Sequence, residues 1–426
     1  MIRGVAIILL LARTAVAGPD TSSSRSLEIA AEITDLRRQI AETRANRRRT
    51  DDDAARRAEI ESLIADVLED ASTRTSFQGG AWNELASADG AFTLRLDAYL
   101  QVEWALNHSD DTVASGAGTA DTLWGFSIVN TRVTFSGTVG DPSWRYVVRL
   151  QMGADGTGDD EFAYIQKKLE QGWFFEAGLV CPMFSLEQAI STTETLGSSL
   201  SFIAGQFDPE NAEGIVLGRR GDQLRGAVTL CNGWSTGSID WNGNQRTGVI
   251  ARSEWKPYGD WNDLYLFNPY PDRVQDGMLL GVGGAYSWGE GVAIDGDQTE
   301  VTADLSFQSP GVGFSSSINW QHWDSDQPLG GRRLAAMMQA AVMPTPNWSI
   351  YLRGEWGSIL DGDQPDFFGA TLGTSWFPSG DASVKLTVEV LGFLGDTSRW
   401  RQDGDVAVLQ VDGDQFAIRA QMQLSL

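Results

Sequence analysis

The sequence predicts an all-β protein: a transmembrane barrel of 16 antiparallel strands, preceded by an N-terminal α-helical coiled coil. Three observations support this prediction. The chain begins with a short apolar segment typical of export signals, and it continues with a stretch that lacks glycine and proline. After residue 76 it changes to long segments in which apolar and polar residues alternate. Together these features indicate an exported protein whose main domain consists of membrane-crossing strands.

The composition argues against several other classes of protein. The chain of 426 residues has 57 acidic and 32 basic residues and a net charge of −25, so we expect no nucleic-acid partner, because phosphates would be repelled. Two cysteines and two histidines are too few for a disulfide framework or a typical zinc centre. The sequence has no P-loop and no dinucleotide fingerprint. We therefore expect neither a metal nor a cofactor.

Residues 1–17 resemble a signal peptide. Arg3 supplies a positive charge, residues 5–12 are apolar, and Ala15-Val16-Ala17 fits a cleavage site with small residues. A buried strand or a membrane anchor is the alternative, but eight apolar residues are too few for a spanning helix, which needs about 20. The sequence predicts export without a transmembrane helix.

Residues 18–76 form the predicted helical segment. Ile29, Ile33, Leu36 and Ile40 follow the four-three-four spacing of a coiled-coil seam, and a second apolar stripe begins near residue 60. Because the helix carries charge on nearly every side, we expect it to self-associate. It could instead pack against its own domain, or tether the outer membrane to peptidoglycan.

Residues 77–426 are the predicted barrel domain. In residues 92–106 every second side chain is apolar and the intervening ones are mostly polar, and residues 144–152, 348–356, 384–390 and 416–426 repeat this alternation. Such strands suit a soluble sandwich with an apolar core or a membrane barrel with an apolar outside. The length of the first run and the export signal favour the barrel. A domain of this size accommodates 16 strands that each cross in about 9–11 residues.

Four segments then resemble the phosphate-selective porin O and P family. They are G-L-V-C-P-M-F-S-L-E at 178–187, S-L-S-F-I at 199–203, G-I-V-L-G at 214–218 and V-T-L-C-N-G at 228–233, and the final strand at 416–426 is also similar. The resemblance implies a homotrimer of 16-stranded barrels embedded in the lipid of a Gram-negative outer membrane. Each barrel would contain a water-filled pore for small polar solutes or ions.

The sequence departs from this family where phosphate is bound. The lysine of the family motif is replaced by Cys181, the phenylalanine of its F-N-G motif by Cys231, and the chain has four lysines in all. Residues 77–426 contain 20 basic and 44 acidic residues. We therefore expect weak selectivity or a preference for cations. An anion- or phosphate-selective porin is the alternative, and a tether that uses the coiled coil is another.

Strand alternation and loop position predict the residues that face the pore. The lumen wall is predicted to contain Arg95, Asp97, Glu103, Arg132, Arg145, Arg149, Arg353 and Arg419. The long irregular stretch from 182 to 222 is predicted to fold into the lumen as a constriction loop carrying Glu187, Glu194, Asp208, Glu210, Glu213, Arg219 and Arg220. An acidic loop opposite an arginine wall would create a transverse field, whereas the same charges could merely solvate a wide lumen.

Two further predictions concern chemistry. Cys181 and Cys231 would lie in an oxidising compartment and could form a disulfide if their Cα atoms come within about 7 Å. The G-W-S-T-G sequence at 233–237 matches a nucleophile elbow, but the residues after its serine are loop-like rather than helical. We therefore predict a protein that is not an enzyme. A secreted carbohydrate-binding sandwich is a further alternative, suggested by the 16 tryptophans.

Overall fold

The computed structural model describes residues 34–39, 83–87, 89, 91–115, 118–152, 158–233, 246–289, 296–324, 330–361, 366–400 and 408–426. The chain divides into two compact units, residues 1–74 and 75–426. In the first unit, residues 34–39 are helical, and Arg38 pairs with Asp35 one turn earlier at 2.6 Å. The predicted signal peptide and the rest of the predicted coiled coil lie outside the described residues. No described helix is long and apolar enough to cross a membrane.

The second unit is a closed barrel of 16 antiparallel strands, which confirms the predicted barrel. A short strand, β1 (Glu84–Ala86), pairs with the start of the first barrel strand. The barrel strands follow one another along the chain as β2 (Thr93–Ser115), β3 (Gly118–Val139), β4 (Asp141–Met152), β5 (Gly158–Lys168), β6 (Trp173–Val180), β7 (Ala212–Arg220), β8 (Leu224–Cys231), β9 (Thr247–Tyr258), β10 (Gly277–Trp288), β11 (Gln298–Ser309), β12 (Val312–Trp323), β13 (Gly331–Thr345), β14 (Trp348–Ile359), β15 (Phe367–Trp376), β16 (Val384–Leu394) and β17 (Gln415–Ser425).

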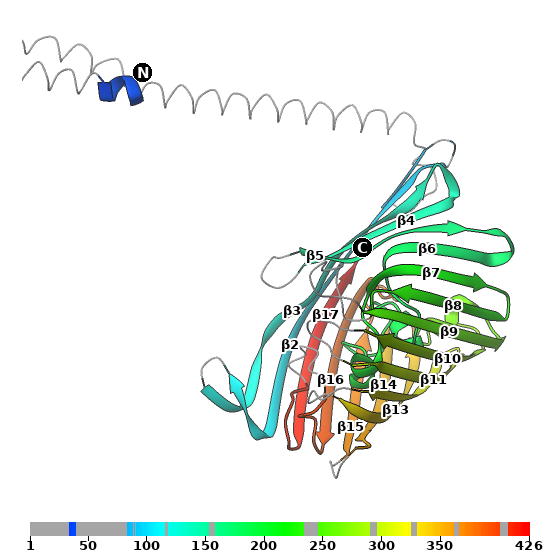
Figure 1. Cartoon of the computed structure of the whole chain (residues 1–426). Helices are drawn as coiled ribbons and strands as arrows, with labels where there is room; N and C mark the ends of the chain where they lie inside the picture. Colours follow the sequence, from blue (N-terminus) through cyan, green and yellow to red (C-terminus); the bar gives the residue numbers. More distant parts are fainter. Residues whose placement is uncertain are drawn as a thin grey trace, which may run out of the picture. The chain divides into compact units, whose positions relative to one another are not determined.

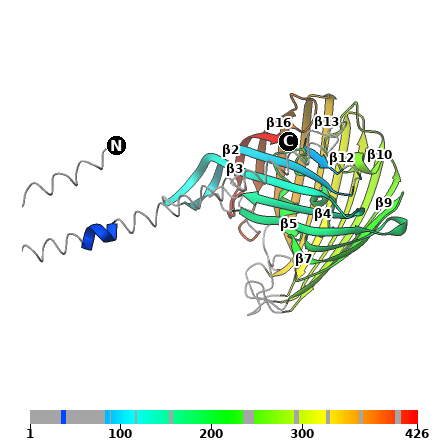
Figure 2. The ribbon, with the colours of Figure 1, turned by 90° about the horizontal axis from the view of Figure 1, so that it is seen from above.

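Each strand pairs with its neighbours in sequence, and the ring is completed where β17 pairs with β2. Figures 1 and 2 show the strands curving round into a wall, with red β17 beside blue β2. We call the end where β2 begins and β17 finishes the terminus end, and the opposite end the loop end. Most connections at the terminus end are tight, such as Gly140 between β3 and β4 and residues 310–311 between β11 and β12. Residues 259–276, between β9 and β10, are a long exception.

Alternating side chains separate an apolar outside from a polar inside. In β14, Ser349, Arg353 and Glu355 are buried, whereas Ile350 and Leu352 are 47% and 58% exposed. The same alternation continues around the barrel, where aliphatic and aromatic residues dominate the exposed face. This inverts the pattern of a soluble protein and suits a barrel whose outside contacts lipid.

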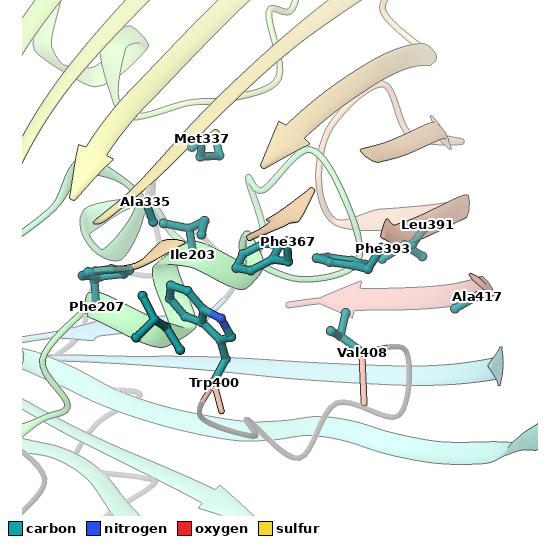
Figure 3. Packing of buried hydrophobic residues seen from close by; sticks show 11 residues of the cluster. Ile203, Phe207, Ala335, Met337, Phe367, Leu391, Phe393, Trp400, Val408 and Ala417 are labelled. Carbon is teal, nitrogen blue, oxygen red and sulfur yellow. The ribbon is translucent and has the colours of Figure 1, made fainter. Parts of the chain in front are cut away.

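Three segments fold inward and fill part of the barrel. The inner loop, residues 181–211, enters from the loop end and contains the short helices α3 (Leu186–Ala189) and α4 (Phe202–Phe207). The β9–β10 connection contains α5 (Trp261–Leu264). The third segment lies between β16 and β17, where Trp400 packs against Phe367 and Phe207 (Figure 3). The apolar core of the protein therefore lies inside the barrel, between these segments and the wall.

Candidate functional site

The inner loop is bound to the barrel wall through its own backbone. Its carbonyl oxygens accept hydrogen bonds from three basic side chains of the wall. Arg252 of β9 donates to the Phe184 oxygen at 2.9 Å, Lys385 of β16 to the Thr195 oxygen at 2.5 Å, and Arg353 of β14 to the Ser199 oxygen at 3.4 Å. Because buried backbone groups are costly to leave unpaired, these contacts fix the path of the loop.

Acidic residues of the wall bind the backbone N–H groups of the same loop. The Leu186 amide donates to Asp304 at 3.2 Å, the Ser198 amide to Glu389 at 3.2 Å, and the Ile203 amide to Glu355 at 3.0 Å. The alternating acidic and basic residues of β9, β11, β14 and β16 thus satisfy both kinds of backbone group. Charge-assisted hydrogen bonds of this type are stronger than neutral ones.

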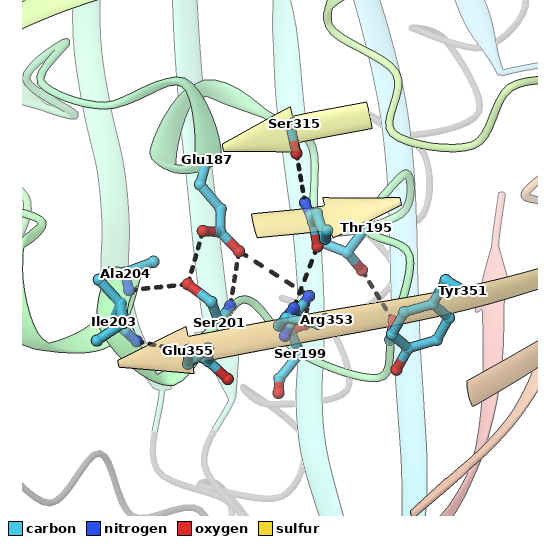
Figure 4. Close-up of polar contacts among 12 residues, drawn as sticks. Glu187, Thr195, Ser199, Ser201, Ile203, Ala204, Ser315, Tyr351, Arg353 and Glu355 are labelled. Carbon is cyan, nitrogen blue, oxygen red and sulfur yellow. Dashed lines mark hydrogen bonds and ion pairs between the residues drawn. The ribbon is translucent and has the colours of Figure 1, made fainter. Parts of the chain in front are cut away.

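Glu187 stabilises the fold of the inner loop itself. Its carboxylate accepts from the Ser201 amide at 2.6 Å and from the Ser201 hydroxyl at 2.7 Å, which joins α3 to the start of α4 (Figure 4). The Ser201 hydroxyl in turn caps α4 by accepting from the Ala204 amide at 3.0 Å. Arg353 lies 4.0 Å from the same carboxylate. Glu187 therefore holds the loop together and is directed away from open solvent.

A buried ion cluster attaches the start of the inner loop to β9, β10 and β11. The Arg252 guanidinium binds both Asp304 oxygens, at 2.7 and 2.8 Å, and Glu254 at 2.8 Å. Gly283 of β10 lies beside it, and a Cβ atom there would come within 2.2 Å of the Phe184 oxygen. Glycine is therefore required for the loop backbone to approach the wall this closely.

A cavity of about 1040 Å³ remains between the inner loop and the barrel wall. It lies mainly against β2–β8, and β14–β17 also contribute lining residues, namely Arg353, Glu355, Thr371, Leu391, Phe393 and Arg419. The loop contributes uncharged atoms such as those of Thr192 and Ser199, together with Asp208 and Glu210. The wall contributes polar and charged side chains, among them Gln101, Glu103, Asn130, Arg132, Arg149, Glu161, Arg220 and Arg225. The lining therefore combines charged and polar groups with apolar side chains such as Phe162 and Phe174.

Arg132 and Arg149 lie together on the cavity wall, as their strand parity predicts. Both face Glu161, at 2.9 and 3.8 Å, and Arg132 also donates to the Thr192 hydroxyl at 2.9 Å. The β4–β5 register shifts between Arg149 and Leu150, which leaves Glu161 as an extra residue on β5. This bulge turns Glu161 inward beside Phe162, although regular alternation would place the two residues on opposite faces.

Arg220 and Arg225 form a second basic group on the cavity wall. They occupy directly paired positions of β7 and β8. The Arg220 guanidinium lies 4.3 Å from the Phe174 ring centre, and that of Arg225 lies 4.0 Å from the Trp261 ring centre. Within the described ranges neither guanidinium has an ion-pair partner. Two like charges at paired strand positions repel each other, so an anion between them would be stabilised.

The acidic residues predicted for the loop divide into two sets. Glu187 is buried and Glu194 is half-buried against the β9–β17 side, where Glu194 accepts from the Tyr270 hydroxyl at 3.3 Å. Asp208 and Glu210 line the cavity. Burial raises the pKa of Asp208 well above its usual value and also raises the pKa of Glu194. Asp208 and Glu210 therefore share the cavity with the arginines of β3, β4, β7 and β8, whereas Glu187 lies 4.0 Å from Arg353 of β14.

Three of the predicted loop residues belong to a strand instead. Glu213, Arg219 and Arg220 lie in β7, because the alternating sequence from Ile215 onward pairs with β6 and β8. By strand parity Arg219 shares the outward face with Ile215 and lies 5.9 Å from the Trp173 ring centre. The inner loop ends before β7, and the prediction that it reaches residue 222 is wrong.

The other predicted wall residues have different surroundings. Arg95 and Asp97 form an exposed ion pair at 2.8 Å near the terminus end, and Arg145 shares the inward face of β4 with Arg149. Glu103 accepts from the Gln421 amide at 3.3 Å. Arg419 is ion-paired with Glu389, directly across the β16–β17 ladder.

The predicted Cys181–Cys231 disulfide is not formed in the structure. Both thiols are free. Cys181 follows the end of β6 and Cys231 ends β8, so β7 separates the two strands. The Cys231 sulfur contacts the Gly248 carbonyl oxygen at 3.5 Å and packs with Phe184 and Ala212.

Sequence reasoning included Arg353 and Glu187 but missed most of the other residues that hold the loop. Lys385 and Glu389 alternate with apolar residues in their strand, as Arg252 and Glu254 do in theirs, which was a usable signal of an inward face. Glu161 carried no such signal, because a bulge is not visible in the sequence pattern. The G-W-S-T-G motif lies outside the described residues except for Gly233.

No family model and no curated protein sequence matches this chain. Solved structures do. The anion-selective porin of Comamonas acidovorans matches with a TM-score of 0.59 at 11% identity, over 79% of this chain and 100% of its own. OmpT of Vibrio cholerae matches with a TM-score of 0.52 at 12% identity, over 79% and 98%. The outer-membrane channel DcaP of Acinetobacter baumannii matches with a TM-score of 0.50 at 12% identity, over 80% and 99%. The chain has the porin fold. The resemblance to the phosphate-selective family in particular stays a prediction.

Proposed function

We propose that the protein is an outer-membrane porin through which small polar solutes and ions diffuse passively. The observation that carries this proposal is the cavity between the inner loop and the barrel wall, which has charged and polar residues in its lining, inside a barrel with an apolar exterior. A water-filled passage needs a polar lining, whereas the outer face needs hydrocarbon-compatible side chains. The porin fold of the solved neighbours is consistent with this function.

We propose weak charge selectivity rather than strong cation preference. The net charge of −25 favours cations near the protein, but the cavity wall itself is rich in arginine, at Arg132, Arg149, Arg220 and Arg225. Many exposed carboxylates lie instead at connections between strands, such as those of Asp361 and Asp381. Acidic entrances and a basic passage act in opposite directions on the same ion.

Planar-bilayer recording tests both statements. Detergent-purified protein should give discrete conductance steps, and a salt gradient should give a small reversal potential. An absence of steps from folded, inserted protein would contradict the channel. A strong anion preference would support the anion- or phosphate-selective alternative, and a strong cation preference would show that the acidic entrances dominate.

We further propose that the protein is a homotrimer and that its subunits meet at β3. This strand pairs with β2 along its length, but it pairs with β4 only from Arg132 to Val139. Among the described residues nothing pairs with the free edge before Arg132, where Trp124 and Phe126 are 70% and 79% exposed. An unpaired strand edge is costly in lipid, and a second copy of the chain would cover it.

Replacing Trp124 and Phe126 with serine tests the interface. We expect the trimer to dissociate in mild detergent more readily than the wild-type protein, as measured by light scattering. The control is Trp348→Ser with Trp376→Ser, a stacked pair on the outer face of β14 and β15. Equal trimer stability in the two double variants would exclude β3 as the contact.

We propose that the terminus end of the barrel faces the periplasm, as does the predicted N-terminal helix. The tether remains a second candidate, because the segment from 44 to 57 carries clustered arginines suited to an anionic partner. Deleting residues 27–76 should leave conductance unchanged. A weakened cell envelope in that variant would support the tether, and an unaltered envelope would count against it.

A further inference from the structure

The β9–β10 connection (residues 259–276) differs from most other connections at the terminus end because it enters the lumen. Asp260 caps α5 by accepting from the Asn262 amide at 2.8 Å, which turns the chain inward. Leu264 and Phe267 are then buried against Leu186 and Ile190 of the inner loop. Two segments that enter from opposite ends of the barrel therefore meet inside it.

Hydrogen bonds join the β9–β10 connection to the inner loop. The Asn268 side-chain amide donates to the carbonyl oxygens of two successive inner-loop residues, Glu194 at 3.1 Å and Thr195 at 3.2 Å. The Tyr270 hydroxyl donates to the Glu194 carboxylate at 3.3 Å. Asn268 is fully buried and Tyr270 is 1% exposed, so water cannot replace either donor without movement of the chain.

The connection is itself attached to the wall beneath it. The Gln308 amide of β11 donates to the Leu266 oxygen at 2.5 Å, and Gly311 donates to the Pro269 oxygen at 3.0 Å. The Tyr270 ring packs edge-on against Phe377, with ring centres 5.6 Å apart. The connection therefore links the inner loop to the barrel wall.

We infer that Asn268 and Tyr270 are positioning residues for the inner loop, and that the β9–β10 connection is a second element of the constriction. The wall holds the loop through Lys385 from one side, while the connection holds residues 194–195 from the terminus end. Without these donors, the turn at residues 191–198 loses part of its support and shifts into the passage or away from it. The expected effect on current rests on the proposed porin function, whereas the positioning of the inner loop does not.

The decisive variant is Asn268→Asp, which keeps the size of the side chain but replaces its amide donor with an acceptor facing two carbonyl oxygens. Its matched control is Asn262→Asp, on the exposed side of α5 in the same connection. Both proteins are compared with the wild-type full chain for heat-modifiable migration, for hydrogen exchange of peptides spanning 186–200, and for current in planar bilayers.

We expect Asn268→Asp to increase both the exchange rate of the 186–200 peptides and the variance of the open-channel current, the latter about twofold. Asn262→Asp should match the wild type in both. Equal exchange in the two variants would overturn the inference, even if the wild type conducts. If the wild type does not conduct but Asn268→Asp still exchanges faster, the positioning role stands and the proposed porin function fails.

Tyr270→Phe provides a milder second variant in case Asn268→Asp does not fold. It removes the donor to Glu194 and retains the ring that packs on Phe377. Its control is Tyr258→Phe, at the exposed end of β9. We expect faster exchange of the 186–200 peptides in Tyr270→Phe only, and unchanged exchange would contradict the role of that hydroxyl.

Discussion

The two halves of the barrel wall use similar charged residues in different ways. On the β9–β13 side, inward charges are buried and paired, as in Arg252 with Asp304. Arg419 of β17 is also paired, with Glu389, although it lines the cavity. On the β2–β8 side, Arg220 and Arg225 face a cavity and stack on aromatic rings without an ion-pair partner in the described ranges. The β9–β13 part of the wall holds segments that fill the lumen, whereas the cavity lies against β2–β8 and against part of β14–β17.

This difference shows that overall charge is a poor guide to what a barrel transports. A carboxylate that is hydrogen-bonded to the inner-loop backbone, as Asp304 is, cannot act on a passing ion as an exposed one does. The residues that matter for permeation are those that remain unneutralised beside the cavity. The predictions below test the two halves separately.

Disrupting the buried ion cluster of β9 and β11, on the side where segments fill the lumen, should have the largest effect on stability. Arg252→Gln leaves Asp304 and Glu254 without their buried partner and removes the donor to the Phe184 oxygen. We expect it to lower the free energy of unfolding by about 3–5 kcal/mol, because a lone buried charge is strongly unfavourable. Urea unfolding of the detergent-solubilised barrel measures this change.

The control is Arg332→Gln, at the exposed end of β13, whose ion pair with Asp361 is solvent-accessible. We expect it to change the free energy of unfolding by less than about 1 kcal/mol. If both variants had the same small effect, the buried ion cluster would not anchor the loop.

Removing the arginine charges of β7 and β8 beside the cavity should change ion selectivity rather than stability. The double variant Arg220→Gln and Arg225→Gln removes two charges from the cavity wall but breaks no ion pair among the described residues. We expect the reversal potential in a salt gradient to move toward cation preference, with unchanged unfolding. A reversal potential equal to that of the wild type would show that ions do not pass this wall.

Asp208 of the inner loop lines the cavity, and replacing it should have the smallest of the three effects. Its pKa is raised well above the usual value by burial, despite a hydrogen bond from Ser185 and the more distant charge of Arg252. A raised carboxyl pKa means that the folded state favours the protonated form. This contribution to stability is therefore present at low pH and is lost as the pH rises through the folded-state pKa.

Asp208→Asn should consequently be more stable than the wild type at pH 8, and the difference should shrink at pH 5. Thermal unfolding at the two pH values measures it, with Asp222→Asn, on an exposed turn, as the control. A difference that did not depend on pH would indicate that Asp208 is charged in the fold at both values.

Most of the barrel could be predicted from the sequence because a period of two identifies a strand and its inward face. In the structure Arg132, Arg149 and Arg419 lie on inward faces of their strands. The pattern could not show which inward residues are paired and buried and which line the cavity, because the partner of a side chain depends on which strands lie opposite it. Glu161 was missed because its bulge interrupts the alternation.

The start of the inner loop was visible in the irregular sequence after residue 181, but its end was misplaced into β7. The role of the β9–β10 connection was not predicted at all. A surface turn and a segment folded into a lumen can have the same composition, and only the contacts of Asn268 and Tyr270 distinguish them.

The central claim, that solutes pass through the cavity beside β2–β8 and not along β9–β13, is tested most directly by cysteine accessibility. Ser127 lines the cavity on β3, whereas Ser306 is fully buried on the inward face of β11. In a background with Cys181→Ser and Cys231→Ser, each is replaced by cysteine and treated with a charged methanethiosulfonate during bilayer recording. We predict that the current changes in Ser127→Cys and stays constant in Ser306→Cys. A change in Ser306→Cys alone would contradict the account.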